Sequence, residues 1–174
     1  RQLGSLYYRV RKGIGFNKTP DEYGAFPTDP YSHTPKHAGA RQPGMTGQVK
    51  EEVLTRFGEL GVRVSGGRVY FRPQLLRSRE FVSGSGTFRY LGVEDNWQTI
   101  AVPAHGLAFT WCQVPILYIW NDDLQPALNI TRDSGKQEVL TQLQLSAEES
   151  AELFKRSGRI RQLTVILRTE ELFE

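Results

Sequence analysis

The chain has 174 residues, of which 39% are hydrophobic and 24% are charged, and its formal net charge is +3. These values are typical of a globular protein with a sizeable core, and no run of basic residues indicates nucleic-acid binding. No segment reaches the roughly 18 apolar residues that a membrane-spanning helix needs. We therefore expect no nucleic-acid partner and no membrane partner. With Cys112 as the single cysteine, the chain has no internal disulfide.

The first 43 residues combine a short helical pattern with an unusually long connection. Residues 1–10 carry apolar side chains at helical spacing, and Gly13 and Gly15 end the pattern. We interpret this segment as the end of a helix from an upstream helical domain of the same polypeptide. Residues 14–43 are rich in proline and aromatic residues, which stiffen a chain and are depleted in disordered segments. The pattern predicts an ordered loop that lines a site.

An amphipathic helix is predicted over residues 46–60. Its apolar stripe contains Val49, Val53, Leu54 and Phe57. Gly61 follows the stripe, and glycine is the residue type most common at the C-terminal cap of a helix. A stripe of this kind needs cover, either from the strands that follow or from a second copy of the chain. We therefore expect that a homodimer could form through this helix.

Beyond residue 61 the apolar period changes from that of a helix to that of strands. Ser146 and Glu149 form a capping box, which predicts one inserted short helix. We expect residues 1–60 to be a helical and loop segment, and residues 61–174 to be an antiparallel, jelly-roll-like β-sandwich domain. The fold class is thus mainly β with α. The predicted strands are a glycine hairpin at 62–71, a second hairpin around Gly84-Ser85-Gly86, strands at 97–102, 107–119, 127–132 and 138–145, and a last strand at 159–168.

The long loop contains the first candidates for chemistry. His33 and His37 have a spacing known from metal sites, but Pro35 lies between them and no third ligand is fixed nearby, although Asp29 or His105 could serve. Histidines that hydrogen-bond loop backbone are the simpler interpretation. A small metal-dependent enzyme that uses this loop remains an alternative. Two further loop acids could also perform acid–base work on a sugar: Asp21 and Glu22.

Three tryptophans could stack on sugar rings. Trp111 and Trp120 lie in or beside the most apolar predicted strand, which favours core packing, whereas Trp97 follows a polar turn and suits either use. Cys112 lies in the same apolar run, where a buried and inert thiol is the usual outcome.

The order of these pieces resembles the C-terminal end of cellobiose-phosphorylase-like enzymes and related glycosidases built on an (α/α)6 toroid. There the last toroid helix leads into a leucine-glycine-x-arginine segment and then a glycine and a proline, and a β-sandwich caps the toroid. The matching residues here are Leu60-Gly61-Val62-Arg63-Val64, Gly66-Gly67-Arg68 and Pro73. The resemblance covers residues 36–90. It implies a C-terminal portion of a larger, bacterial-type carbohydrate-active enzyme, glycoside hydrolase- or phosphorylase-like and not catalytic alone.

In that family the loop that enters the last helix borders the sugar-binding cleft. The resemblance implies that His37, Arg41 and Gln42 edge the cleft and that Tyr31 or Phe26 stacks on a sugar ring, with His33 as a further contact to the oligosaccharide. We expect no metal and no cofactor. A small-residue pair and a Gly-Trp of the family are replaced here by residues 40–43 and by Gly44-Met45. Hydrolysis, elimination and binding alone therefore stay open. The alternative is an autonomous carbohydrate-binding or protein-interaction β-sandwich module.

Overall fold

The computed structural model describes residues 1–14, 30–31, 42–43 and 47–173, with side chains for residues 1–11 and 53–173. Contacts divide the chain into two compact units, residues 1–57 and residues 58–174. Each unit is described by itself. Among the described helices, none is long and apolar enough to cross a membrane.

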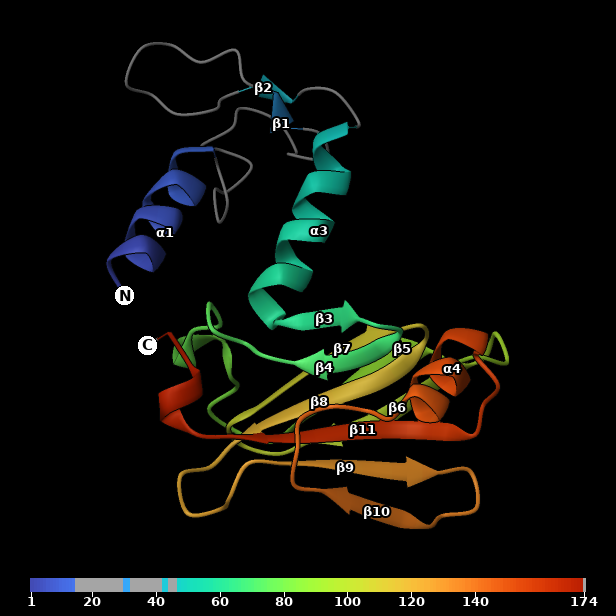
Figure 1. Cartoon of the computed structure of the whole chain (residues 1–174). Helices are drawn as coiled ribbons and strands as arrows, with labels where there is room; N and C mark the ends of the chain where they lie inside the picture. Colours follow the sequence, from blue (N-terminus) through green and yellow to red (C-terminus); the bar gives the residue numbers. More distant parts are fainter. Residues whose placement is uncertain (15–29, 32–41, 44–46, 174) are drawn as a thin grey trace. The chain divides into compact units, whose positions relative to one another are not determined.

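Among its described residues, the first unit contains two helices and a short two-stranded ladder (Figure 1). Helix α1 spans Gln2–Ile14 and helix α3 spans Gly47–Leu60, whose last residues belong to the second unit. Both predicted helices are therefore present. Strands β1 (Pro30–Tyr31) and β2 (Gln42–Pro43) pair in antiparallel fashion.

The apolar faces of the two helices remain largely exposed. In α3, Val53 is 50% and Leu54 is 71% exposed, while Val49 lies outside the residues whose side chains are described. In α1, Leu3, Leu6 and Val10 are all exposed. Dimerisation through α3 therefore remains a prediction, for which this chain offers exposed apolar side chains.

The second unit is mainly β with one further helix, which confirms the predicted fold class. Its five-stranded sheet has the order β10-β9-β11-β8-β7, and two hairpins, β3-β4 and β5-β6, form separate two-stranded ladders. Short 3₁₀ turns lie at Ser78–Glu80 and Thr169–Glu171. The elements are β3 (Val62–Ser65), β4 (Arg68–Phe71), β5 (Gly86–Leu91), β6 (Trp97–Val102), β7 (Gly106–Trp111), β8 (Val114–Trp120), β9 (Ala127–Arg132), β10 (Gln137–Leu140), α4 (Ala147–Lys155) and β11 (Ile160–Leu167).

The five-stranded sheet is mixed, because β11 runs parallel to β8 and antiparallel to β9. The crossover from β8 to β11 includes β9, β10 and α4, so β11 enters the sheet between two strands that precede it. β8 lies inside the sheet, between β11 and the edge strand β7, and is buried on both faces, as its continuous apolar run VPILY predicts. Pro115 pairs with Thr110 of β7, and the parallel ladder with β11 begins one residue later, at Ile116. The missing N–H of proline therefore removes no bond from that ladder.

The single strand predicted at residues 107–119 is wrong. It is two strands, β7 and β8, joined by a two-residue turn at Cys112 and Gln113. Both turn residues have positive φ, 51° and 63°, a conformation that normally selects glycine or asparagine. The turn is held from outside, since the Gln113 amide donates to the Gly92 carbonyl and accepts from Arg156. No local turn signal marks it in the sequence.

The second predicted hairpin is also wrong in its pairing. The segment Gly84-Ser85-Gly86 does not join two strands. Instead β5 begins at Gly86 and pairs with β6 through the turn at residues 92–96. The Gly92 amide is part of this turn, because its N–H donates to the Asn96 carbonyl.

The β3-β4 hairpin forms as predicted and packs over the five-stranded sheet. Gly66 and Gly67 supply the two positive φ angles of its turn. Tyr118 of β8 is fully buried, packs edge-to-face on Phe71 of β4, and donates a 2.7 Å hydrogen bond to the Leu60 carbonyl. The side-chain contacts of Tyr118 thus fix the hairpin and the end of α3 on the sheet. Burial raises the pKa of Tyr118, which keeps its hydroxyl protonated as the donor.

Helix α4 begins with the predicted capping box. The Ser146 hydroxyl accepts from the Glu149 N–H, and the Glu149 carboxylate accepts from the Ser146 N–H. One turn later the buried Ser150 hydroxyl accepts a hydrogen bond from the Val69 N–H of β4. This bond ties α4 to the β3-β4 hairpin.

Candidate functional site

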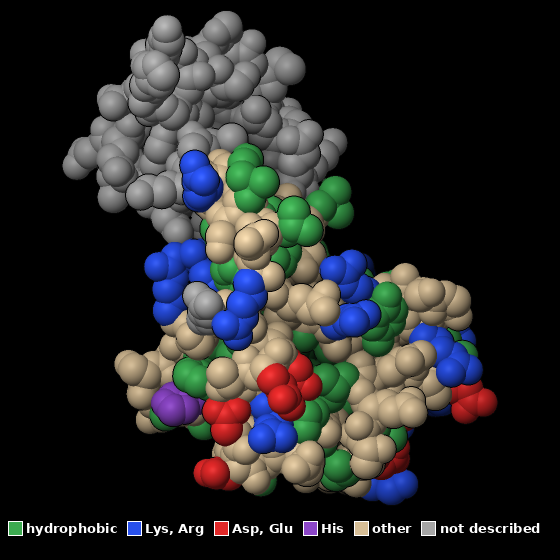
Figure 2. Space-filling model, turned by 60° about the vertical axis from the view of Figure 1, so that its left-hand side comes forward, with side chains coloured by type: hydrophobic (Ala, Val, Ile, Leu, Met, Phe, Trp, Pro, Cys, Tyr) green, Lys and Arg blue, Asp and Glu red, His purple; other side chains and the backbone are tan. Residues whose placement is uncertain are grey.

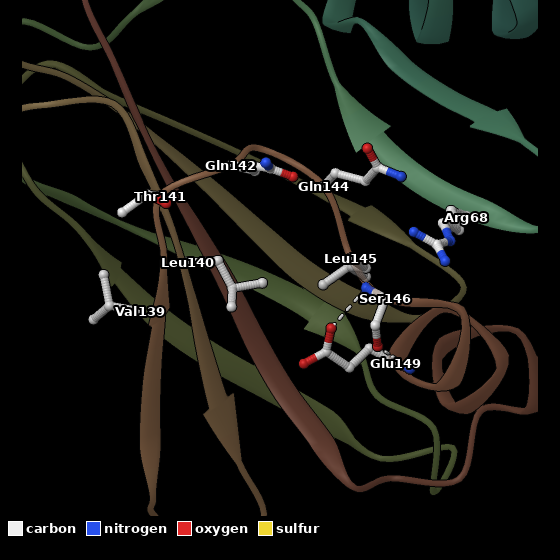
Figure 3. A pocket seen from close by; sticks show the side chains of 9 residues that line it. All are labelled: Arg68, Val139, Leu140, Thr141, Gln142, Gln144, Leu145, Ser146 and Glu149. Carbon is white, nitrogen blue, oxygen red and sulfur yellow. Dashed lines mark hydrogen bonds between the residues drawn. The ribbon is translucent and has the colours of Figure 1, made fainter.

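A pocket of about 490 Å³ opens where β10, the start of α4 and the start of β4 meet (Figure 3). In Figure 3, Val139 and Arg68 lie at opposite ends of the pocket, with two glutamines above and Glu149 below. Its volume lies in the range of small-molecule sites, and most of its polar lining is uncharged. The lining residues are Arg68, Val139, Leu140, Thr141, Gln142, Gln144, Leu145, Ser146 and Glu149.

One wall of the pocket belongs to a small extra ladder on β4. Tyr70 forms an antiparallel bridge with Gln144, flanked by bonds from the Phe71 N–H to the Leu143 carbonyl and from the Leu145 N–H to the Val69 carbonyl. Tyr70 and Gln144 are thus a directly opposed pair whose side chains share a face. The chain after β10 thereby becomes a third strand-like segment beside β3 and β4.

The outer face of this ladder follows from its register. Arg63 lies opposite Tyr70 in the β3-β4 hairpin, and Arg68 and Arg72 lie two residues to either side of Tyr70 along the chain. Because side chains alternate along a strand, these residues share the solvent side while Val69 and Phe71 are buried. We call this surface the Tyr70 face. It consists of Arg63, Arg68, Tyr70, Arg72 and Gln144.

The single carboxylate of the pocket is already engaged. Glu149 accepts from Arg132 at 3.0 Å and from the Ser146 N–H at 2.8 Å. Arg132 also donates to Glu138 at 2.8 Å. Glu149 thus serves as a helix cap and as an acceptor for Arg132.

The hydrogen bonds of Arg132 also lower the pKa of a second carboxyl group, that of Glu138. Hydrogen bonds from Arg132, and next from Lys136, lower the pKa of Glu138 to about 2. The bond to Glu138 in turn raises the pKa of Arg132. At neutral pH the Glu138 carboxylate therefore holds no proton available for transfer.

The structure brings two of the five predicted site residues together. Tyr31 and Gln42 are directly opposite each other in the β1-β2 ladder. His33, His37 and Arg41 lie outside the described residues, in the connection that this ladder closes at its base. The role of all five in binding sugar remains a prediction.

The described residues contain no cluster of side chains that matches the hypothetical metal site. Within the described ranges, no group of three or more His, Cys, Asp or Glu side chains could hold a metal ion. The proposed extra ligand His105 instead stacks on Trp120, with ring centroids 5.3 Å apart. Asp29, Asp21 and Glu22 lie outside the described residues, as His33 and His37 do.

The three tryptophans differ in how far their side chains are exposed to solvent. Trp120 packs on Phe81 and donates through its indole N–H to Thr169, and Trp111 is half-buried. Trp97 is 62% exposed, and the Arg89 guanidinium lies 4.3 Å from the centre of its ring. Cys112 is half-buried at a turn rather than inside a strand, and burial raises the pKa of its thiol. A raised pKa favours the protonated thiol, and the expected full burial of Cys112 is not found.

The pocket residues were not predicted as a site. The sequence shows alternation in VRVSGGRVYFR and thus places Arg63, Arg68 and Arg72 on one side of a hairpin. It does not show that residues 141–146 return to this hairpin, because the Tyr70–Gln144 bridge joins segments far apart in the chain. The alternation of apolar and polar residues could have predicted that the arginines share one face of the hairpin. No local pattern predicts that Gln142 and Gln144 lie beside them.

Comparison of the sequence with models of protein families and with curated proteins finds no match.

Proposed function

We propose that this chain is the C-terminal portion of a carbohydrate-active enzyme and that its strand-rich unit binds an oligosaccharide in the pocket beside the Tyr70 face. The observation that carries the proposal is the pocket of about 490 Å³ with a lining of amides, hydroxyls and one free guanidinium. The resemblance to the end of toroid-type enzymes supports the same class of ligand.

The lining matches the hydrogen-bonding character of a sugar. Each sugar hydroxyl is both a donor and an acceptor, and a glutamine amide offers both functions on one planar group. Gln142 and Gln144 supply two such amides, and Thr141 supplies a hydroxyl. Val139, which is 67% exposed, offers an apolar surface to the C–H side of a sugar ring. A few polar groups beside an apolar surface are typical of small-ligand sites.

The pocket favours binding over catalysis. Glycoside hydrolysis normally requires two carboxyl groups that flank the scissile bond, one of them protonated at the start. Glu149 is the single acid of the lining, and its two oxygens already accept from Arg132 and from the Ser146 N–H. The unit is therefore proposed as a substrate-holding cap whose catalytic acid lies elsewhere in the enzyme.

The experiment is isothermal titration of the chain with a panel of neutral and acidic oligosaccharides, together with Gln142→Ala and Gln144→Ala. We expect at least one saccharide to bind and both substitutions to weaken it about tenfold, since each removes a bidentate amide. Gln137→Ala is the matched control, because Gln137 is exposed on β10 and does not line the pocket. Absence of binding by every saccharide, or an equal loss in the control, would sink the proposal.

A second candidate is a protein-interaction module, favoured by α1. Leu3, Leu6 and Val10 follow helical spacing and are 83%, 53% and 57% exposed. Such a stripe is a surface that normally packs on another protein segment. Protein association and saccharide binding, measured on the same variant, distinguish the two candidates. Substitution of Leu6 by Glu would abolish protein association and leave saccharide titration unchanged.

A further inference from the structure

The Tyr70 face carries three arginines whose charges are not neutralised. Arg63, Arg68 and Arg72 are exposed, and none has a carboxylate partner within the part of the chain that the structure describes. Elsewhere in the same unit, Arg77, Arg132, Arg159, Arg161 and Arg168 each lie within 4 Å of a glutamate carboxylate. Arg79, Arg89 and Arg156 also lack a carboxylate partner among the described residues, so what distinguishes the Tyr70 face is that three such arginines lie together on one ladder.

The spacing of the three arginines is set by the ladder. Arg68 precedes Tyr70 by two residues and Arg72 follows it by two residues. Residues two apart on a strand are about 6.6 Å apart, so each arginine lies about that far from Tyr70 along the chain. Arg63 lies across from Tyr70 on β3. The three cationic groups therefore surround one half-buried tyrosine. Arg68 and Arg72 are four residues apart, which places them about 13 Å from each other along the strand, a separation that suits different anionic groups of one ligand.

The pocket identifies the anion as part of a larger polar molecule. Arg68 belongs both to the Tyr70 face and to the pocket lining, so a ligand in the pocket reaches this face through Arg68. The acid of the pocket lining, Glu149, is paired with Arg132, which weakens its repulsion of an anionic ligand. Guanidinium groups bind carboxylates through two parallel hydrogen bonds.

We propose that the Tyr70 face recognises the carboxylate groups of an acidic oligosaccharide, that is, one that contains uronate residues. One sugar ring lies in the pocket against Gln142 and Gln144, and its carboxylate meets Arg68. Arg63 and Arg72 bind the carboxylates of neighbouring rings. This inference rests on the proposed carbohydrate function and specifies the class of ligand.

A nucleic acid fits the same surface less well. Tyr70 is half-buried and offers little ring surface on which a base could stack. Arg63, Arg68 and Arg72 are three separate charges, and the Lys and Arg side chains visible in Figure 2 likewise form separate groups rather than a continuous basic track. Nucleic-acid binding relies on many phosphate contacts along such a track.

The experiment compares matched pairs of trisaccharides that differ in one group. Each pair has the same linkage and ring stereochemistry, with uronate in one member and the neutral hexose in the other, in the gluco, galacto and manno series. Calorimetry with the full chain should show at least tenfold tighter binding of one uronate member than of its neutral counterpart. The preference should weaken at 0.5 M salt, because exposed ion pairs are screened.

The variants Arg63→Gln, Arg68→Gln and Arg72→Gln assign the effect. Each should reduce uronate affinity about three- to tenfold and leave the affinity for the neutral member nearly unchanged, except at Arg68, which also touches the pocket. Arg79→Gln is the matched control, since Arg79 is exposed, lacks an acidic partner among the described residues and lies outside the Tyr70 face.

Each alternative outcome is decisive. Equal affinity for both members of every pair overturns the uronate inference and leaves the proposed function standing. Tighter binding of a single-stranded oligonucleotide than of any saccharide also overturns it in favour of a nucleic-acid ligand. Absence of binding by all saccharides overturns the inference and the proposed function together.

Discussion

Arg132 and Arg68 both lie beside the start of α4, and their surroundings are opposite. Arg132 contacts two carboxylates, Glu138 at 2.8 Å and Glu149 at 3.0 Å, and its side chain is 20% exposed. Arg68 is exposed at the edge of the pocket and has no carboxylate partner in the described ranges. The first arginine links three elements of the fold, β9, β10 and α4. The second is available to a ligand.

This difference teaches that the same residue type has a structural or a binding role according to its partners. A guanidinium with its donors already bonded to carboxylates gains little from an incoming ligand. A guanidinium bonded to water exchanges those bonds for a ligand's carboxylate when one arrives. The following experiments test this contrast, beginning with the residue that holds the two environments together.

Ser150→Ala should have the largest effect on stability. The buried Ser150 hydroxyl accepts from the Val69 N–H next to Arg68 and donates to the Ser146 carbonyl beside Glu149. Its loss leaves a buried N–H without its partner, which costs about 2 kcal/mol of unfolding free energy. Urea denaturation measures this change, and the exposed Ser83→Ala should shift it by less than about 0.5 kcal/mol. Equal effects of the two substitutions would contradict the tie between α4 and β4.

Arg132→Gln should have the next largest effect. It removes two charge-assisted hydrogen bonds, and we expect a loss of about 1–2 kcal/mol after allowance for solvent screening. Arg161→Gln is the control, because Arg161 is more exposed and lies 3.8 Å from the Glu94 carboxylate. The comparison uses urea denaturation at pH 7. A loss for Arg132→Gln as small as that of the control would show that Arg132 is not structural.

Glu138 should report the same network through pH. Its folded-state pKa of about 2 is below the ordinary value of 4.5, because Arg132 and then Lys136 stabilise the ionised form. The contribution of this carboxylate to stability is therefore complete above pH 4.5 and is lost as the pH falls toward 2. NMR titration of the Glu138 carboxyl should show this value in the wild type and a higher value in Arg132→Gln. An unchanged value in the variant would refute the assignment.

Arg68→Gln should have the smallest effect on stability, less than about 0.5 kcal/mol, because the side chain has no partner to lose. Its effect should appear in ligand binding alone. The same urea measurement checks it, and a loss above about 1 kcal/mol would place Arg68 in the structural class with Arg132.

Local sequence patterns predicted the local structure well. The capping box of Ser146 and Glu149, the Gly66-Gly67 hairpin and the alternation that predicts β11 all depend on neighbours in the chain, and the structure contains each. Gly61 illustrates the same point, since it ends α3 with a positive φ of 72° and lies so close to the Arg72 carbonyl that a side chain has no room.

Features that depend on distant partners were missed. The turn at Cys112 and Gln113 has no glycine, and its bonds to Gly92 and Arg156 come from other parts of the fold. The pocket likewise depends on the Tyr70–Gln144 bridge, which joins β4 to a segment more than seventy residues away. Alternation indicated where the arginines point, but their lack of acidic partners is a property of the folded unit.

The position of β11 has a consequence for how the strand-rich unit assembles. β11 follows all the other strands in sequence, yet it lies between β8 and β9 and pairs with both. Before it is in place, β7-β8 and β9-β10 are two separate hairpins with no hydrogen bonds between them in the sheet. During synthesis β8 and β9 therefore lack the strand that joins them until residues 160–167 have left the ribosome. The unit is thus expected to fold in one late step rather than strand by strand.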